Sequence, residues 1–343
     1  MDSFKDIQEL QVGTQRLFSA THEEILDGVT TDVYFVKTRD VLRHAGKLST
    51  PVTAEIFARK PGIFAGLPEV LEVLRNRPLF IEALPEGTPF QPKEVVVRIR
   101  GSYDVFGMYE TVLLGMLASA SAWATAAKEC VDAAEGKPVL CFGARHVHPA
   151  IAPVMERTAV AVGGCTGASC ILGAKLAGRE PMGTVPHAAA LIIGDTVDLA
   201  WAYDGAMPAD DARAVLVDTF KDEAEESLRV ARALGKKLAA IRLDTPGERG
   251  GVTADLVREV RQRLDMEGYN HVKIIVSGGL SPDRIRDLAQ AGADSFGVGS
   301  YISHAKPIDM TMDLKEIDGR PYAKRGRIPG ITPNPRLVVM QEG

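Results

Sequence analysis

Residues 272–300 read VKIIVSGGLSPDRIRDLAQAGADSFGVGS, and this stretch contains two strand-like runs joined by a helical segment. The apolar run 272–276 leads into a Ser-Gly-Gly loop, and Ser281 followed by proline is a typical helix start. Gly292 marks the end of that helix, and the second run, 295–299, follows closely. The order strand, helix, strand is typical of a parallel sheet, because parallel neighbours need a long crossover connection.

The same alternation extends back to about residue 137. Apolar residues recur at helical spacing between strand-like runs, and glycines or capping residues mark many of the boundaries. Buried strands alternating with helices predict an α/β fold with a parallel sheet. A doubly wound sheet also fits, but glycine-rich loops after the last two strands favour a barrel. The predicted strands are 138–143, 182–185, 213–218, 238–243, 272–276 and 295–299, and the predicted helices include 222–234, 253–267 and 281–291.

The two flanks of this region have a different pattern. The N-terminal third mixes strands and helices, and after residue 305 the alternation stops. Asp318-Gly319 predicts a hairpin turn, and we expect this C-terminal segment to return to the N-terminal domain. In the N-terminal third we predict helices at 31–44, 67–74 and 105–128 and strands at 52–58 and 95–100, with Val33, Val36, Val41 and Leu42 as the apolar stripe of the first helix.

Composition excludes several classes of protein. The chain has 343 residues, 45% hydrophobic and 25% charged, as in a soluble globular protein of one large or two medium domains. Its net charge of −5 disfavours a general nucleic-acid binder. The four cysteines form no C-x-x-C pair, so neither a zinc knuckle nor a dithiol motif is indicated. No signal peptide and no uninterrupted apolar run of about 18 residues is evident, so we expect a cytoplasmic protein without a membrane partner.

Two glycine-rich loops predict a phosphate site. Ser277, Gly278 and Gly279 follow one strand, and Gly299 and Ser300 follow the next. Glycine lets backbone N–H groups approach a phosphate closely, and a following helix N-terminus adds positive potential. Loops of this kind after the last strands form the phosphate sites of many barrels. Two ordinary turns remain the alternative.

Polar residues after other predicted strands are further candidates. Asp244 is placed to orient ribose hydroxyls or hold Mg²⁺, although a helix cap or surface turn also fits. Arg249 lies in a glycine-containing loop that we expect to act as a lid over an anionic group. Phe142 and Arg145 suit a planar, negatively charged ring, through stacking and pairing with a carboxylate. His187 ends the predicted strand 182–185 and is a candidate catalytic residue. His146 and His148 lack a third ligand, so no metal site is predicted there.

Taken in order along the chain, these motifs resemble the nicotinate phosphoribosyltransferase family, within the type II phosphoribosyltransferases. The similarity spans nearly the whole sequence. The similar segments are TTDVYF (30–35), GSYDVFGMYETVLLGML (101–117), FGARHVHP (142–149), GGCTGASCILGAKLAG (163–178), GTVPHA (183–188), IRLDT (241–245), VSGGL (276–280), GVGS (297–300) and EIDGRPYAK (316–324). Where the family has a Gly-Thr-Ser-Asn loop, this sequence has Gly-Cys-Thr-Gly, and it has no cysteine-rich zinc knuckle.

The resemblance implies an incomplete (β/α) barrel over residues 113–305 and a discontinuous α+β domain made of 1–112 plus 306–343. It implies a homodimer or higher oligomer with shared sites. The implied activity joins nicotinate to phosphoribosyl pyrophosphate, giving nicotinate mononucleotide and pyrophosphate in NAD biosynthesis, with Mg²⁺ and, in ATP-coupled members, ATP. Quinolinate phosphoribosyltransferase, which also decarboxylates, and a non-catalytic phosphosugar-binding relative remain alternatives.

The resemblance also implies residue roles. Phe142 would stack on the pyridine ring, and the partner subunit's Tyr34 would cover its other face. Arg145 would lie beside the base and the phosphates. Arg249, inferred from its loop and not from the resemblance, is a further candidate substrate contact. Thr166 would lie near the ring substituent, where a neutral residue does not repel a carboxylate and favours nicotinate over nicotinamide. His187 and Asp244 would be catalytic, the first phosphorylated in ATP-coupled members and the second orienting the ribose, and Ser277, Gly278, Gly279, Gly299 and Ser300 would bind the 5′-phosphate.

Overall fold

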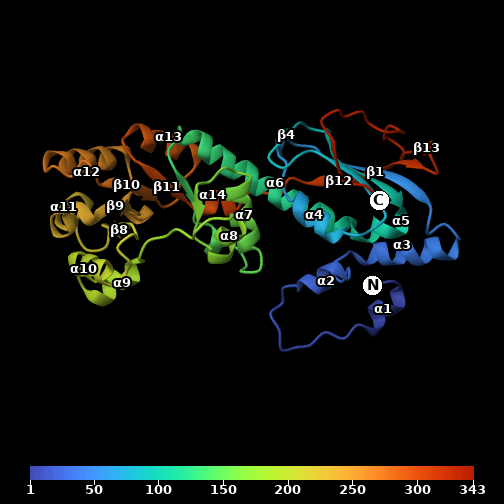
Figure 1. The fold of residues 1–343 in the computed structure, drawn as a ribbon, viewed down its shortest axis with the longest axis horizontal. Helices are drawn as coiled ribbons and strands as arrows, with labels where there is room; N and C mark the ends of the chain where they lie inside the picture. Colours follow the sequence, from blue (N-terminus) through green and yellow to red (C-terminus); the bar gives the residue numbers. More distant parts are fainter. The chain divides into compact units, whose positions relative to one another are not determined.

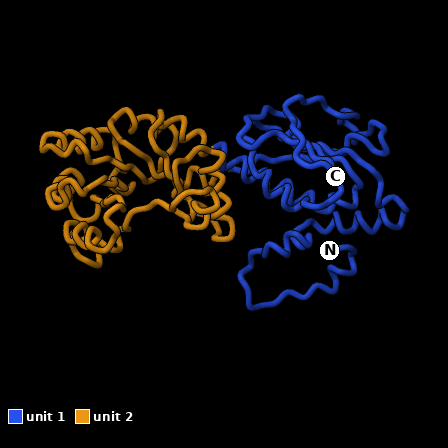
Figure 2. The backbone as a smooth tube through the Cα atoms, in the orientation of Figure 1, with its two compact units in different colours: residues 1–125, 306–343 blue, residues 126–305 orange.

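The computed structural model describes residues 1–343, and the chain divides into two compact units (Figure 2). The first consists of Met1–Thr125 together with Lys306–Gly343, and the second of Ala126–Ala305. The division falls within the long helix α6 (Glu110–Ala133), further along the chain than the predicted boundary at residue 112. The first unit is therefore built from both ends of the chain.

The first unit is organised around an antiparallel six-stranded sheet in the order β13-β12-β1-β5-β3-β14. Strand β12, from the C-terminal segment, pairs with β1 from Val52↔Ile317 to Ala58↔Met310. The predicted return of the C-terminal segment to the N-terminal sheet is confirmed by this pairing. The strands are β1 (Pro51–Ala58), β3 (Phe80–Ala83), β5 (Val95–Ser102), β12 (Met310–Ile317), β13 (Arg320–Pro321) and β14 (Val338–Gln341), with β2 (Gly62–Ile63) and β4 (Pro89–Phe90) as a separate pair.

The predicted hairpin at Asp318-Gly319 is also confirmed. Ile317 pairs with Arg320, and the two residues between them have φ of +51° and +71°. A two-residue turn with both φ values positive matches the right-handed twist of the strands it joins, and Asp-Gly is a favoured sequence for it.

Helix α3 (Val33–His44) forms where helix 31–44 was predicted, but it buries a different face. Phe35 and Val36 are buried, whereas Val33 is 46% exposed and Val41 65% exposed. The predicted stripe is therefore wrong at Val33 and Val41, which lie on a surface that nothing within this unit covers. The other helices of this unit are α1 (Phe4–Glu9), α2 (His22–Leu26), α4 (Leu67–Val73) and α5 (Tyr103–Phe106).

The second unit contains a parallel six-stranded sheet in the order β7-β6-β11-β10-β9-β8, of which Figure 1 labels β8 to β11. Strands β7 and β8 are its two edges and do not pair with each other, so the sheet is an open half-barrel. The predicted incomplete α/β barrel is confirmed. The strands are β6 (Val139–Cys141), β7 (Gly167–Ala168), β8 (Arg213–Leu216), β9 (Leu238–Leu243), β10 (Lys273–Ser277) and β11 (Ser295–Val298).

One predicted strand is wrong. Residues 182–185 form no strand, and the sixth strand is β7, which sequence reasoning missed. A single backbone bond joins this stretch to β7, in which Met182 N–H donates to the Ala168 carbonyl. Gly183 within the stretch and Pro186 directly after it disfavour a continuous ladder of strand hydrogen bonds. The helices of this unit are α7 (Ala152–Ala161), α8 (Ile171–Leu176), α9 (His187–Ile193), α10 (Thr196–Ala206), α11 (Glu223–Leu234), α12 (Ala254–Met266), α13 (Pro282–Gln290) and α14 (Ser300–Ser303).

One helical stretch, Tyr103–Ala133, is long and apolar enough to cross a membrane by length and composition alone. Half of its apolar window is buried inside the structure, and Leu113 and Leu117 are fully buried. Because Gly, Ser and Thr are interspersed among its apolar residues, it has no uninterrupted apolar run of membrane-spanning length. It is a core helix of the fold.

Candidate active site at the carboxyl edge of the parallel sheet

The six parallel strands bring their carboxyl ends to one edge of the second unit. In folds of this kind, ligands bind at that edge because the loops after the strands converge there. The residues that follow the strands are Phe142 after β6, Ser169 after β7, Asp218 after β8, Asp244 after β9, Gly278 after β10 and Gly299 after β11.

Phe142 is placed by backbone pairing and by two glycines of β11 and its loop. Its N–H donates to the Val298 carbonyl at 2.7 Å. A Cβ at Gly297 would lie 2.5 Å from the Phe142 ring, and a Cβ at Gly299 would lie 2.6 Å from the His146 ring. The Gly-Val-Gly sequence therefore makes room for these two rings, in addition to any contact of its backbone with phosphate.

Arg242, in strand β9, was missed by the sequence analysis. Its guanidinium carbon lies 5.1 Å from the centre of the Phe142 ring. Its Nε donates to Ser277 Oγ and its Nη1 to Thr184 Oγ1, both at 2.8 Å. Its second terminal nitrogen lies 3.6 Å from Asp244 Oδ1. A single arginine thus connects the aromatic ring, the strand-end carboxylate and the segment that leads to His187.

Asp244 is held from the β10 side by Ser277, whose hydroxyl donates to Asp244 Oδ1 at 2.6 Å. A Cβ at Gly278 would lie 3.3 Å from the same oxygen, and Gly278 and Gly279 have φ of +92° and +57°. Glycine is therefore required at Gly278 both for its backbone conformation and for space. Because the Ser277 hydroxyl donates to Asp244 and the residue is buried, the backbone is the part of this loop that is left to contact a ligand.

His187, at the start of α9, contacts a carboxylate that sequence reasoning missed. Its Nε2 lies 3.0 Å from Asp218 Oδ2, and the Asp218 side chain is 2% exposed. Burial raises the pKa of the Asp218 carboxyl, the His187 contact lowers it, and the nearby Asp244 carboxylate raises it further. Asp218 Oδ1 and Thr219 Oγ1 are buried without a hydrogen-bond partner. The repeated Asp-Thr after β8 and β9 is the signal that would have identified Asp218.

The loop after β6 carries Arg145, which is exposed and makes no hydrogen bond or ion pair within the chain. The buried Glu156, also missed, accepts from Ala144 N–H at 3.0 Å and from Ser169 Oγ at 3.1 Å. It thereby ties the Arg145 turn to the loop after β7. Burial lowers the pKa of His146, and Arg145 and His304 add to that effect.

No group of three or more histidine, cysteine or acidic side chains is arranged to hold a metal ion. His148 is exposed, and its Nδ1 accepts from Ala150 N–H at 3.1 Å. His146 instead faces Ser303, with 3.3 Å between Nδ1 and Oγ.

The structure does not bring Thr166 to this edge. Its N–H donates to the Val139 carbonyl, so it lies at the start of β7, level with the start of β6. Ser169 occupies the carboxyl end of that strand instead. The predicted contact between Thr166 and the ring substituent stays a prediction, and the strand that follows Thr166 consists of Gly167 and Ala168 alone.

The remaining predicted residues divide between the two units. Gly279 lies in the loop after β10 and Ser300 begins α14 after β11, both at the carboxyl edge. Arg249 lies in the loop after β9, where its Nη2 is 3.6 Å from Glu223 Oε2. Tyr34 belongs to α3 of the first unit and is 55% exposed.

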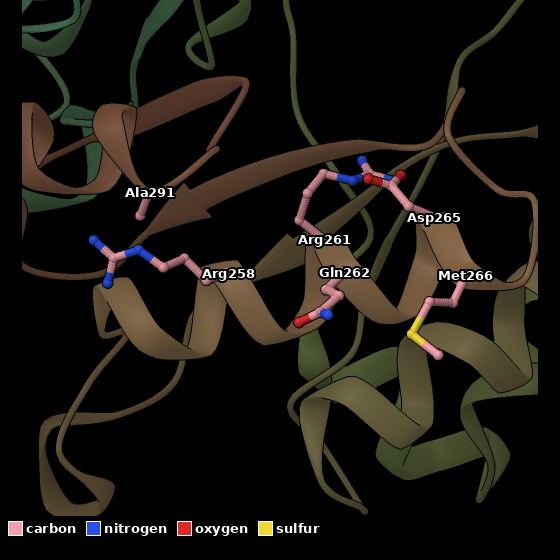
Figure 3. A pocket seen from close by; sticks show the side chains of 6 residues that line it. All are labelled: Arg258, Arg261, Gln262, Asp265, Met266 and Ala291. Atoms are coloured by element: carbon pink, nitrogen blue, oxygen red, sulfur yellow. The ribbon is translucent and has the colours of Figure 1, made fainter.

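A separate hollow of about 490 Å³ lies on the outer surface, beside α12 (Figure 3). Arg258 and Arg261 project from the helix there, but both are engaged by neighbouring groups of the chain: Arg258 by Asp255, and Arg261 by two backbone carbonyls. The hollow contains none of the residues of the carboxyl edge.

The comparison with protein-family models identifies both units. Residues 32–121 match the model "Quinolinate phosphoribosyl transferase, N-terminal domain", and residues 123–313 match its C-terminal domain. The chain belongs to the quinolinate phosphoribosyl transferase family. It is thus a type II phosphoribosyltransferase, a pyridine phosphoribosyltransferase of NAD biosynthesis, and the resemblance inferred from the sequence is confirmed. The enzymes of this family are soluble.

Individual relatives carry two kinds of name. A solved structure described as nicotinate-nucleotide pyrophosphorylase from Pyrococcus furiosus is 44% identical, with a TM-score of 0.88, covering 93% of this chain and 82% of that one. Nicotinate phosphoribosyltransferase pncB1 of Mycobacterium tuberculosis is 29% identical over 87% of this chain and 74% of the relative. Human nicotinic acid phosphoribosyltransferase is 19% identical, with a TM-score of 0.71, covering 88% of this chain and 77% of that one, and shows the fold alone.

Proposed function

We propose that this enzyme transfers the phosphoribosyl group of phosphoribosyl pyrophosphate to nicotinate, giving nicotinate mononucleotide and pyrophosphate. The observation that carries the proposal is the guanidinium of Arg242 lying 5.1 Å from the Phe142 ring centre, directly beside Asp244. An aromatic surface for a flat ring, a cation for its carboxylate and a carboxylate for the ribose meet at one place. The substrate that unites these three needs is an anionic pyridine joined to a sugar.

The reaction forms a bond between the pyridine nitrogen and C1 of the ribose while the bond from C1 to pyrophosphate breaks. The leaving pyrophosphate takes the electron pair of the broken bond. The pyridine nitrogen has a free lone pair, so no general base is required, and positioning supplies much of the acceleration. Positive charge develops on the sugar in the transition state, and the fixed Asp244 carboxylate, held by Ser277, is placed to stabilise it.

The anionic groups of the sugar phosphate are assigned to backbone amides and a metal ion. The backbone of Gly278 and Gly279 and the N-terminus of α13 offer N–H groups to the 5′-phosphate, and Gly299 and Ser300 follow the next strand, β11. Mg²⁺ fits beside them: Asp218 Oδ1 and Thr219 Oγ1 are buried oxygens without a partner, next to Asp244. When bound there, Mg²⁺ supplies charge neutralisation for the pyrophosphate group.

ATP coupling is assigned to His187. Its ring is 36% exposed and its Nε2 faces the buried Asp218, so the carboxylate orients the imidazole. The opposite ring nitrogen, Nδ1, has no partner in the chain and is left to accept a phosphoryl group.

Nicotinate is favoured over dicarboxylates because few cations at the carboxyl edge are unengaged. After its bonds to Ser277 and Thr184, Arg242 has donors left for one carboxylate, and Arg249 faces Glu223, which leaves Arg145 as the cation without a contact in the chain. Ser169 at the end of β7 is neutral and does not repel a carboxylate. Quinolinate, with decarboxylation, is the second candidate: the free Arg145 offers a partner for a second carboxylate, and the matching domain models carry that name.

We further propose a cytoplasmic homodimer in which the partner subunit's Tyr34 covers the pyridine ring. Tyr34 is 55% exposed on the same α3 surface as the uncovered Val33 and Val41. Apolar side chains left uncovered within their own unit are typical of an interface.

Replacing Asp244 tests the proposed role of this site. With nicotinate, phosphoribosyl pyrophosphate and Mg²⁺, we expect wild type to form nicotinate mononucleotide, and Asp244→Asn to lose turnover by about 100-fold or more. Calorimetry should show that the variant still binds phosphoribosyl pyrophosphate. Binding without turnover in wild type would instead identify a non-catalytic phosphosugar-binding protein.

A further inference from the structure

The loop after β9 is a compact exposed turn. Residues 246–251 contain a 3₁₀ turn, Gly247–Arg249, and Gly251 N–H donates back to the Pro246 carbonyl at 3.0 Å. Gly250 and Gly251 have φ of +93° and +69°, conformations that favour glycine. Adjacent glycines of this kind allow the turn to move as a unit on the end of the strand.

A single buried carboxylate lies beneath this turn. Glu223 is the first residue of α11 and is 3% exposed. Its Oε1 accepts from Thr245 Oγ1 at 2.8 Å, and its Oε2 faces Arg249 Nη2 at 3.6 Å. Glu223 is thus linked both to the residue next to Asp244 and to the arginine of the loop.

The two contacts of Glu223 differ in strength. The hydrogen bond to Thr245 is short and buried, because Thr245 is 5% exposed. The contact with Arg249 is longer, and the Arg249 side chain is 60% exposed. An exposed ion pair at that distance is weak and is exchanged readily for a stronger anion. The arginine therefore has two sources of negative charge within reach of its loop, Glu223 and any anion at the carboxyl edge.

We propose that Glu223 is a positioning residue that holds Arg249 away from the site until the pyrophosphate group of the substrate arrives. Arg249 then leaves Glu223 for the pyrophosphate oxygens, and the turn 246–251 closes over them. Thr245 stays bound to Glu223, so the backbone that carries Asp244 does not move. This proposal rests on the proposed function for the identity of the anion.

The switch makes a directional prediction for substrate affinity. An arginine held by Glu223 lowers the fraction of enzyme that is ready to bind, and the apparent dissociation constant for the substrate rises in inverse proportion to that fraction. Glu223→Gln keeps an acceptor for Thr245 and removes the charge that holds Arg249. We expect it to lower KM for phosphoribosyl pyrophosphate about threefold, with kcat for a chemistry-limited step unchanged. We expect Arg249→Gln to raise that KM about tenfold.

The double variant distinguishes a switch from a structural role. If Glu223 acts through Arg249, Glu223→Gln has no effect on KM in the Arg249→Gln background. An unchanged effect in that background, or a fall in kcat instead of a fall in KM, would show that Glu223 acts through Thr245 and Asp244 and would overturn the proposal. Arg258→Gln is the matched control, because it removes a surface arginine that is paired with Asp255 within α12, the helix after the loop.

Limited trypsin digestion tests the switch without catalysis. Cleavage after Arg249 gives fragments 1–249 and 250–343, and we expect Glu223→Gln to be cut there several times faster than wild type. Inorganic pyrophosphate with Mg²⁺ should protect both proteins at Arg249, while cleavage after the exposed Arg325 serves as the internal reference. Equal cleavage of the two proteins, or no protection by pyrophosphate, would overturn the switch. Protection in a protein that does not use nicotinate would keep the switch and reject the proposed base.

Discussion

Replacing Arg242 by glutamine should change which pyridine the enzyme prefers. The side chain makes two hydrogen bonds of 2.8 Å, to Ser277 and Thr184, and faces the Phe142 ring. In the complex we assign its remaining donors to the nicotinate carboxylate. Glutamine is neutral and shorter, so it removes this charged contact without introducing bulk.

The size of the effect follows from the kind of contact that is lost. A hydrogen bond to a charged group contributes about 1.5–3 kcal/mol, which corresponds to roughly 10- to 150-fold in kcat/KM for nicotinate. Nicotinamide has no carboxylate, so with this substrate Arg242→Gln loses only the contacts of Arg242 with the ring and with Asp244, which both substrates share. The ratio of kcat/KM for nicotinate to that for nicotinamide should therefore fall by about tenfold or more.

The assay measures kcat/KM for nicotinate and for nicotinamide in wild type, in Arg242→Gln and in the surface control Arg258→Gln. Thermal unfolding accompanies it, because the lost bonds to Ser277 and Thr184 should lower Tm by a few degrees. A ratio that stays at the wild-type value while both rates fall together would place the carboxylate elsewhere and refute this account of Arg242.

Three further results are expected. Gly297→Ala would bring a Cβ to 2.5 Å from the Phe142 ring, so we expect about 1–3 kcal/mol of destabilisation and a raised KM for the pyridine but not for phosphoribosyl pyrophosphate. His187→Ala should make the rates with and without ATP equal; a persisting stimulation would exclude His187 as the phosphoryl acceptor. Burial, with a smaller contribution from Asp313, raises the pKa of Glu110 to about 7, so its ionised form opposes folding and stability is lost as pH rises through about 7. The loss begins near the ordinary carboxyl pKa of 4.5, so Glu110→Gln should raise Tm at pH 8 and leave it nearly unchanged at pH 4, and equal shifts at both pH values would contradict this.

Local sequence patterns predicted the parallel sheet well because its strands are bounded by clear signals. Ser281, the proline after it and Gly292 mark one helix, and the structure places α13 between them. Strand β7 has no such signals: it consists of Gly167 and Ala168, and no periodicity can be read from two residues. The sequence therefore predicts a strand at 182–185 and a glycine-rich loop where β7 forms.

The site residues that were missed share a different cause. Arg242 lies within strand β9, and a charged residue in a strand is usually interpreted as facing solvent. Its place near the carboxyl end of the strand, beside Asp244, becomes clear only from the fold. Asp218 follows β8 just as Asp244 follows β9, but its importance depends on His187 reaching it from α9. Contacts between residues distant in sequence arise from the fold, so the motifs alone did not indicate them.

The pyridine used by the enzyme is the most direct test of the account. Wild-type protein is given phosphoribosyl pyrophosphate, Mg²⁺ and an equimolar mixture of ring-deuterated nicotinate, unlabelled quinolinate and nicotinamide, and the mass of the mononucleotide product is measured. The label is needed because nicotinate and decarboxylated quinolinate give the same product. We predict deuterated nicotinate mononucleotide. Unlabelled nicotinate mononucleotide would identify quinolinate as the substrate and contradict the central claim, as would nicotinamide mononucleotide.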